Sequence, residues 1–406
     1  MDDRQAPGGS PAAALRWAAA ASQLEDPRAA AEQAASAVQS QLSDVPVDLV
    51  LAFFSGALAA EGEAISEVLR ARLRTRCFAA VSASAVITSD REIESGPALT
   101  LLAGVLPGVT IHPFILASPL WGDAMKDAAE FARQTSGVQD AELVLLFGDP
   151  FTLPVDRVLS AFHRHAPQTR VVGGMASAAT RPNGNTLILN DWLSHDGGIA
   201  ISLGGALRAD VVVSQGCRPI GPPLSVTQAE GNLIQSLDGR PALERTEEVL
   251  RALSEEEQEQ LRHGLYLGRP TRGSASGRGD YLIRNLLGAD RKRGAIAVAD
   301  QVRERERVRL HVRDAKIARE DLELLLAPQE FDARAEAVLV FTCTGRGREF
   351  FGEPNGDVKL VQSALGGGVP AAGLFCAGEI GPVGEENFVH GHTASIAILR
   401  RRSTGD

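Results

Sequence analysis

One pattern recurs three times along the chain and limits the folds that it can adopt. A short apolar segment is followed by an amphipathic segment with helical spacing and then by a second short apolar segment. The first apolar segments are residues 48–54, 143–147 and 337–341. Segments of this length are typical of buried strands, and a helix between two of them crosses over to a parallel neighbour. The pattern therefore predicts an α/β fold built on parallel strand pairs.

The second strand of each unit ends in a run of very small side chains. These three runs are residues 82–85 (SASA), 176–179 (ASAA) and 376–379 (CAGE). Ligands of open α/β sheets bind beyond the carboxyl ends of the strands, where small side chains leave backbone N–H groups accessible. Small side chains also let neighbouring elements pack closely. Both interpretations stay open for the three runs.

Other segments predict antiparallel neighbours for these strands. Residues 98–106 and 109–116 flank a Pro-Gly pair, and residues 186–193 and 198–203 flank a Ser-His-Asp-Gly turn, so both pairs are expected to form hairpins. Residues 302–313 contain alternating apolar and basic side chains. This alternation indicates a strand with a basic, solvated face or, alternatively, a basic binding ridge. The sheets are therefore expected to be mixed.

The first 44 residues are rich in alanine and carry no chemically distinctive group. Helical spacing on both sides of Pro27 predicts two short helices that pack on the body. We expect an α/β protein with two α/β domains, at residues 45–238 and 239–400. Their sheets are expected to be mixed, to be built largely from parallel units and to be flanked by helices. A short Ala-rich helical arm at residues 1–44 precedes the two domains.

Composition excludes several classes of function. The net charge of −10 repels phosphate backbones, and aromatic residues make up only 5% of the chain, so no nucleic-acid partner is expected. Four scattered cysteines without a CxxC spacing indicate a reducing compartment. The acidic start does not match a signal peptide, and no window is long and apolar enough to span a membrane. We therefore expect a cytoplasmic protein without a membrane partner.

A glycine- and arginine-containing loop follows the third buried strand. Residues 342–348 read TCTGRGR and precede a helix, which is the topology of a phosphate-binding loop. The motif G-x-x-x-x-G-K-[ST] is absent, so the nucleotide signal is weak. Arg346 and Arg348 could pair with a carboxylate or phosphate of a ligand, or could hold the loop through salt bridges.

Cys376 and Glu379 lie at a strand end and precede two histidines, His390 and His392. A cysteine nucleophile needs a base within hydrogen-bond reach, so an uncharacterised enzyme that uses Cys376 or Glu379 with one of the histidines is one alternative. A buried cysteine more commonly behaves as a small hydrophobic residue. Cys376 and the histidines supply only three zinc ligands at no recognised spacing, so we expect no metal and no cofactor.

Longer segments in the second half of the chain resemble the FIST family. They are residues 212–221 (VVSQGCRPIG), 345–355 (GRGREFFGEPN), 375–384 (FCAGEIGPVG) and 387–399 (NFVHGHTASIAIL). The resemblance implies an N-terminal FIST domain followed by a FIST C domain, over about residues 45–400. It also implies a sensory module of signalling proteins that binds small ligands, for which amino acids are a proposed class. It supplies no catalytic residues.

We therefore expect a small-ligand-binding sensory protein whose ligand, an amino acid or small carboxylate, lies between two domains. Arg346 or Arg348, with Arg218, would hold the anionic group, and Glu379 would hold an ammonium group. The candidate ligand-binding residues are Ser82, Ser84, Gly174, Ser177, Arg218, Cys343, Gly345, Arg346, Gly347, Arg348, Asn355, Cys376, Gly378, Glu379 and His390. A signalling protein is a possible partner. The other alternative is an interaction scaffold that uses the acidic helix near residue 255 and the basic loop at 269–279.

Overall fold

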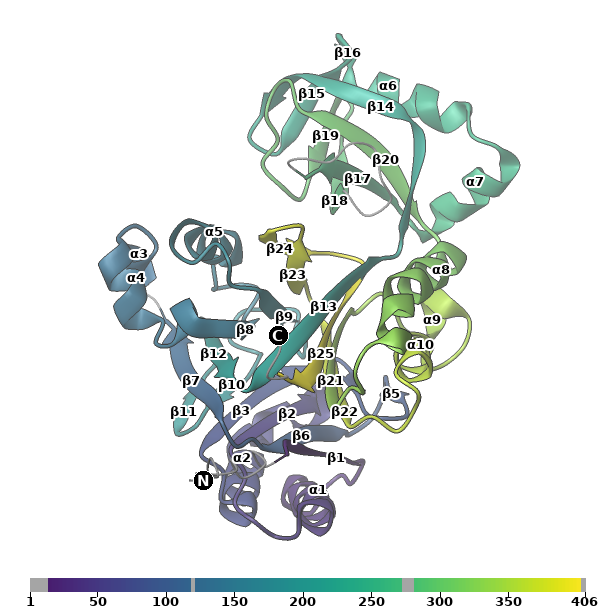
Figure 1. The fold of residues 1–406 in the computed structure, drawn as a ribbon. Helices are drawn as coiled ribbons and strands as arrows, with labels where there is room; N and C mark the ends of the chain where they lie inside the picture. Colours follow the sequence, from purple (N-terminus) through teal and green to yellow (C-terminus); the bar gives the residue numbers. More distant parts are fainter. Residues whose placement is uncertain (1–13, 118–120, 272–280, 403–406) are drawn as a thin grey trace, which may run out of the picture.

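The computed structural model describes residues 14–117, 121–271 and 281–402, and in these residues three six-stranded sheets share one strand order (Figure 1). The first sheet is β1 (Arg16–Ser22), β6 (Leu99–Val105), β2 (Leu49–Ser55), β3 (Cys77–Ala83), β10 (Leu187–Leu189) and β11 (Trp192–Ser194). The second is β7 (Val109–Leu116), β12 (Gly198–Gly205), β8 (Ala141–Gly148), β9 (Val171–Met175), β23 (Glu379–Val383) and β24 (Glu386–His390). The third is β13 (Leu207–Gln215), β25 (Thr393–Arg401), β21 (Ala337–Cys343), β22 (Ala371–Cys376), β4 (Val86–Ile87) and β5 (Glu92–Ile93).

The central strands of each sheet are parallel, as the repeated pattern predicts. These pairs are β2 with β3, β8 with β9, and β21 with β22, and all other strand pairs of the three sheets are antiparallel. The helices that connect the parallel strands are α2 (Gly62–Leu73), α5 (Val155–His165) and α10 (Gly356–Ala364). The expected fold class, α/β with mixed sheets flanked by helices, is therefore confirmed.

We call the three repeats unit 1 (residues 16–105), unit 2 (109–205) and unit 3 (207–215 with 315–401). Each unit supplies the two end strands of another unit's sheet. The hairpin β4–β5 leaves unit 1 and pairs with β22, β10–β11 leaves unit 2 and pairs with β3, and β23–β24 leaves unit 3 and pairs with β9. The exchange is cyclic, so the three sheets are interlocked.

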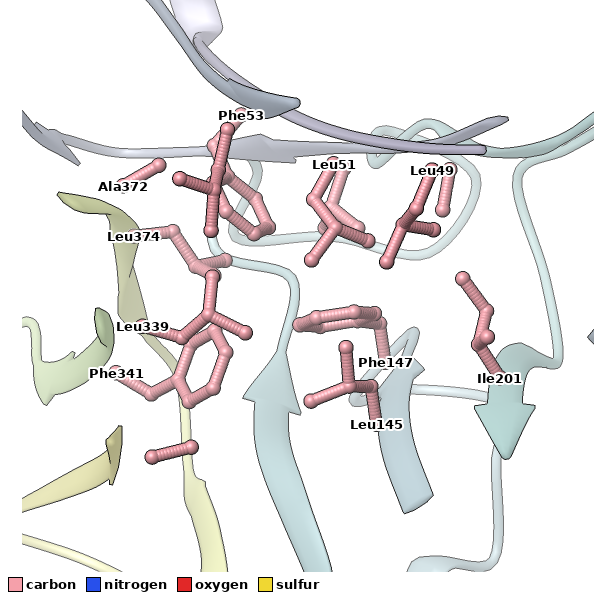
Figure 2. Packing of buried hydrophobic residues seen from close by; sticks show 14 of the residues in the cluster. Leu49, Leu51, Phe53, Leu145, Phe147, Ile201, Leu339, Phe341, Ala372 and Leu374 are labelled. Carbon is pink, nitrogen blue, oxygen red and sulfur yellow. The ribbon is translucent and has the colours of Figure 1, made fainter. Parts of the chain in front are cut away.

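One face of each sheet faces a common core. In β2, Leu49, Leu51 and Phe53 enter this core, while the alternate side chains pack under the helices of unit 1, so the strand is apolar on both faces. Phe53 meets Phe147 of β8 and Phe341 of β21, as Figure 2 shows. The ring centroids are 5.6 Å apart for Phe53 and Phe147, 5.5 Å for Phe147 and Phe341, and 6.2 Å for Phe53 and Phe341, and all three pairs have edge-to-face orientations. The three units therefore meet at one aromatic cluster.

Helices cover the outer face of each sheet. The remaining helices of the units are α1 (Pro27–Leu42), η1 (Gly56–Glu61), α3 (Trp121–Ala124), α4 (Ala128–Gln134), η2 (Val138–Asp140), α8 (Ala315–Leu326), η4 (Ala327–Phe331) and α9 (Arg348–Phe351). α1 begins where Asp26 accepts a hydrogen bond from Ala29 N–H at 2.7 Å. None of the described helices is long and apolar enough to cross a membrane.

A fourth sheet forms a module inserted into unit 3, at residues 217–313. Its strands are β14 (Cys217–Glu230), β20 (Arg307–Arg313), β17 (Leu265–Pro270), β18 (Tyr281–Asp290), β19 (Ala295–Val298), β15 (Leu233–Leu237) and β16 (Arg240–Pro241). Its helices are α6 (Ala242–Arg251), α7 (Glu255–Gln260) and η3 (Leu261–His263). The inserted module has its own apolar core and projects from the three units (Figure 1). The expected domain boundary at residue 238 falls between β15 and β16 and stays a prediction.

Three sequence expectations about local structure were wrong. Residues 186–193 and 198–203 do not form a hairpin with each other: the first segment contains the hairpin β10–β11, and the second is β12, which lies in a different sheet. The segment predicted as the first N-terminal helix is the strand β1, which pairs with β6 along its full length. Its alanines let α1 pack closely against it. The tertiary pairing therefore overrides the helical spacing of the sequence. Residues 98–106 and 109–116 form β6 and β7, which join different sheets instead of one hairpin. The short turn between them carries the chain from unit 1 to unit 2. The basic loop at 269–279 lies mostly outside the described residues.

The aromatic cluster predicts the cost of truncating one ring. Phe147 is fully buried, and Phe147→Ala should lower the free energy of unfolding by about 3–5 kcal/mol, because it leaves a cavity where all three units meet. Urea unfolding followed by circular dichroism measures the change. Phe331→Ala is the control, since that ring is 89% exposed. Equal midpoints for the two variants would contradict a central role for the cluster.

Candidate functional site

The three runs of small residues meet at one place. Ser177 N–H donates to Ser82 O at 3.4 Å, and Ser177 Oγ accepts a hydrogen bond from Ser84 N–H at 2.9 Å. Ser177 Oγ also donates to Phe375 O at 2.5 Å, and Ala377 N–H donates to the carbonyl of β9 residue Met175 at 3.0 Å. The runs lie at the carboxyl ends of β3, β9 and β22, so the hairpin exchange brings these ends together.

Close packing accounts for part of this composition. A Cβ on Gly174 would lie 2.3 Å from Cys376 Sγ, so no larger residue fits there. Gly378 is less crowded, because its Cβ would lie 3.1 Å from Val389. Ser84 and Ala377 are nevertheless exposed, and Ser177 is half-buried. The meeting point therefore combines tightly packed backbone with an open surface of small side chains.

A buried ion pair holds the loop that follows β21. Arg346 Nη2 lies 2.7 Å from Asp357 Oδ1, and Arg346 Nε lies 3.0 Å from Asp357 Oδ2; neither side chain is exposed. Thr342 Oγ1 donates a further hydrogen bond to Asp357. This bidentate pairing fixes the guanidinium plane. Arg346 Nη1 has no hydrogen-bond partner in the described structure.

Unit 1 supports this loop from the other side. Glu92, on the exchanged hairpin β4–β5, accepts hydrogen bonds from the N–H groups of Asp357 and Val358, both at 2.9 Å, at the first turn of α10. Asn355 Oδ1 accepts a hydrogen bond from Glu92 N–H at 2.9 Å. Burial, followed by the nearby charge of Asp357, raises the pKa of Glu92 to about 7.

Glu379 is the second buried titratable group of the site. It begins β23 and is not exposed, and its Oε2 accepts hydrogen bonds from Thr393 N–H at 3.1 Å and Thr393 Oγ1 at 2.8 Å. Its Oε1 has no partner in the described structure. Burial raises the pKa of Glu379 to about 8, against the hydrogen bonds from Thr393, which lower it. The carboxyl group therefore holds its proton at neutral pH.

Gly216 packs against Arg346 and against the segment that precedes Thr393. A Cβ on Gly216 would lie 2.9 Å from Arg346 Nη1 and 3.1 Å from His392 O, and Gly216 N–H donates to His392 O at 3.1 Å. Thr393, which binds Glu379, is the next residue after His392. The backbone of these residues thus connects Arg346 with Glu379.

Three of the four cysteines surround the same place, but their thiols are protonated. Cys343 and Cys376 are register partners in the parallel strands β21 and β22, and every cysteine is buried and free. Burial raises the pKa of Cys343 and Cys217 to about 12, and the pKa of Cys376 well above its usual value. A thiol in this state is a poor nucleophile.

The two histidines have other partners. His390 Nε2 pairs with Gly381 O at 3.0 Å, and His392 Nε2 pairs with Asn285 Oδ1 at 2.9 Å. Burial lowers the pKa of each to about 4. No hydrogen bond joins either histidine to Cys376 in the described structure. No group of His, Cys, Asp or Glu side chains in the described residues could hold a metal ion.

The remaining candidates lie around or away from this centre. Gly345 O accepts a hydrogen bond from Arg313, and a Cβ on Gly347 would lie 2.1 Å from Glu94 Oε2. Arg348 is exposed, and its N–H donates to both Glu94 oxygens at 2.9 and 3.0 Å. Arg218 belongs to the inserted module, where it pairs with Glu257 at 3.1 Å. The structure thus brings Arg346 and Glu379 together and places Arg218 elsewhere.

Sequence reasoning did not identify four polar partners that complete the site: Glu92, Arg313, Asp357 and Thr393. Glu92 lies at least 263 residues from the groups that it binds. Thr393 lies 14 residues from Glu379. The position of Asp357 could be predicted locally, because carboxylates are typical of the first turn of a helix. This local pattern does not reveal that Asp357 pairs with Arg346.

The raised pKa of Glu379 predicts a pH-dependent stability. Between pH 4.5 and about 8 the folded state holds a proton that the unfolded state releases, so the free energy of unfolding falls as pH rises through this window. Glu379→Gln should remove this pH dependence. The free energy of unfolding of the variant, taken relative to that of the native chain at the same pH, should therefore be higher at pH 8 than at pH 5. Urea unfolding at several pH values measures the difference. The exposed Glu323→Gln is the control, and a parallel response of both variants would contradict the assignment.

Family models match most of the chain: the FIST N domain over residues 48–240 and the FIST C domain over residues 242–382. Uncharacterised proteins of Mycobacterium bovis and Mycobacterium tuberculosis are 35% identical over 379 residues, which cover 92% of this chain and 96% of theirs.

A cyanuric acid hydrolase structure covers 96% of this chain and 100% of its own, at 11% identity and a TM-score of 0.30. Phosphoribosylformylglycinamidine synthase II from Thermotoga maritima covers 95% of this chain and 72% of its own, at 8% identity and a TM-score of 0.21. Both scores are too low to relate the folds. FIST domains are associated with sensory function through small-ligand binding. The two consecutive domain matches and the full-length relatives show that the chain belongs to the FIST family, with a FIST N domain followed by a FIST C domain.

Proposed function

We propose that this protein is a cytoplasmic sensor that binds an amino acid or a small carboxylate between Arg346 and Glu379, and that it signals through a partner protein. The observation that carries the proposal is a set of buried polar atoms without a hydrogen-bond partner in the described structure, among which Arg346 Nη1 and Glu379 Oε1 belong to groups of opposite charge type. The free, buried cysteines fit a reducing compartment such as the cytoplasm.

A buried polar atom without a hydrogen-bond partner is costly unless a partner is supplied. Asp357 already takes two nitrogens of Arg346 and sets the direction of the third, Nη1. A ligand carboxylate at Nη1 would complete the hydrogen bonding of the guanidinium group. A ligand ammonium group would give Glu379 Oε1 the donor that it lacks in the described structure. An amino acid carries both groups at short separation, which favours this class.

Access is the remaining requirement, because the side chains of Arg346 and Glu379 are both fully buried. The exposed residues nearest in sequence are Thr344, Arg348 and Ala377, and His392 is half-buried. The segment with His392 contacts Gly216, the residue through which β13 leads into the inserted module. We infer that a ligand enters when this segment moves, so that binding changes the connection to the inserted module.

A panel of amino acids tests this proposal by thermal shift. A ligand at 100 times its Kd stabilises the folded state by about 2.7 kcal/mol. We expect at least one amino acid to do so, and its analogues that lack the amino or the carboxyl group to do so less. Glu379→Gln should weaken the response to the amino group more than the response to the carboxyl group. The exposed Arg334→Ala is the control. No response across the panel, or an unchanged response in Glu379→Gln, would count against the site.

Binding of an ammonium group should release a proton. Glu379 is protonated at pH 7 because its pKa is about 8, and it must ionise to pair with a cation. Isothermal titration calorimetry of the responding amino acid in phosphate and in Tris should therefore give different apparent enthalpies. The difference should vanish in Glu379→Gln. Equal enthalpies in both buffers for the native chain would exclude Glu379 as the ammonium partner.

A further inference from the structure

A second concave region lies outside the site between Arg346 and Glu379. It is a cleft of about 990 Å³. Its walls come from α5 of unit 2 and the exchanged strand β24 of unit 3 on one side, and from β17, β18 and β20 of the inserted module on the other. Figure 1 shows where these elements lie. None of the candidate ligand-binding residues lines it. Its volume is at the upper end of the range for small-molecule sites.

Two arginines of the module wall are held in fixed orientations. Arg269 Nη1 and Arg284 Nε both bind Asp300 Oδ2, at 2.5 and 2.8 Å. Arg269 also makes a bidentate pair with Glu306, at 3.1 and 3.0 Å. These carboxylates neutralise the two guanidinium groups and hold them in place, so the wall is rigid before any ligand arrives.

The positive charge that remains lies on neighbouring residues. Arg303 and Arg307 line the same cleft and are exposed, and neither has an ion pair or a side-chain hydrogen bond in the described structure. Arg164 of α5 faces the cleft with a hydrogen bond to a carbonyl, Met125 O, at 3.3 Å. Five arginines against four carboxylates give the lining an excess of positive charge on a chain of net charge −10. This excess favours an anionic ligand.

The other wall offers complementary groups. Asp156 and Glu386 supply carboxylate oxygens that can accept hydrogen bonds from hydroxyl groups. Leu159 and the half-buried Phe388 supply apolar surface for a ring. A ligand that satisfies both walls carries an anionic group, hydroxyl groups and a flat apolar part.

We propose that this cleft binds a phosphorylated small molecule of about mononucleotide size. The phosphate lies at Arg303 and Arg307, where two unpaired guanidinium groups match a dianion. The sugar hydroxyls face Asp156 and Glu386, and the base lies against Phe388. The proposal is independent of the amino-acid site, because the two share no residue.

Isothermal titration calorimetry on the full chain tests the proposal, with the four ribonucleoside monophosphates, adenosine, inorganic phosphate and citrate as probes. AMP should bind more tightly than phosphate or citrate, adenosine should bind at least tenfold more weakly than AMP, and the other three monophosphates report the preference for the base. The Kd should rise with added KCl. Absence of binding by all four monophosphates would overturn the proposal, as would equal binding of AMP and adenosine or tighter binding of citrate.

A matched pair of variants locates the binding. The double substitution Arg303→Ala and Arg307→Ala should weaken binding at least tenfold; both side chains are exposed, so the fold should persist. The double substitution Arg291→Ala and Lys292→Ala removes the same charge from an exposed turn of the same module, outside the cleft, and should leave the Kd within twofold. Hydrogen exchange with bound nucleotide should slow in α5 and in residues 299–307. An equal loss in both double variants, or protection confined to other segments, would refute this location.

Discussion

The edge-to-face contact of Phe53, Phe147 and Phe341 is the constraint on which the arrangement of the three units depends. Each ring comes from the first parallel strand of a different unit, near the carboxyl end of that strand. Because all three rings are buried in one cluster, the three strands must approach each other at equivalent positions. Their parallel partners then end close together, and the exchanged hairpins cross from one sheet to the next at this point. The meeting of the three small-residue runs is a consequence of this packing.

The same crossing explains why polar groups are buried beside an apolar core. The exchanged hairpin of unit 1 brings Glu92 to the first turn of α10, and the hairpin of unit 3 begins with Glu379. Both carboxyl groups lose water, and their pKa values rise because burial disfavours the charged form. Arg346 keeps its charge through Asp357. In the function proposed above, a ligand acts on this site by supplying the missing hydrogen-bond partner.

Much of the candidate site could be predicted from local patterns, because Arg346 and Glu379 stand in glycine-containing segments at strand ends. Their partners could not be predicted, since Glu92 is 265 residues from Asp357, and Thr393 lies on a strand of a different sheet from Glu379. Arg218 shows the opposite failure. It stands in a segment that resembles the family motif, but β14 carries it into the inserted module, where Glu257 binds it. Nothing in the local sequence distinguishes a strand that continues its sheet from one that leaves it.

The sequence by itself determined the three strand–helix–strand units, their parallel pairs and the small residues at the strand ends, because these depend on hydrophobic periodicity and side-chain size over short distances. Only the tertiary structure decided that each hairpin joins another unit's sheet, that β1 is a strand, and that Arg346 and Glu379 share one site. The physical reason is that the backbone hydrogen bonds between strands are the same whichever side chains the strands carry. Their pairing is selected by the packing of the whole core, in which Phe53 finds partners about 90 and 290 residues away.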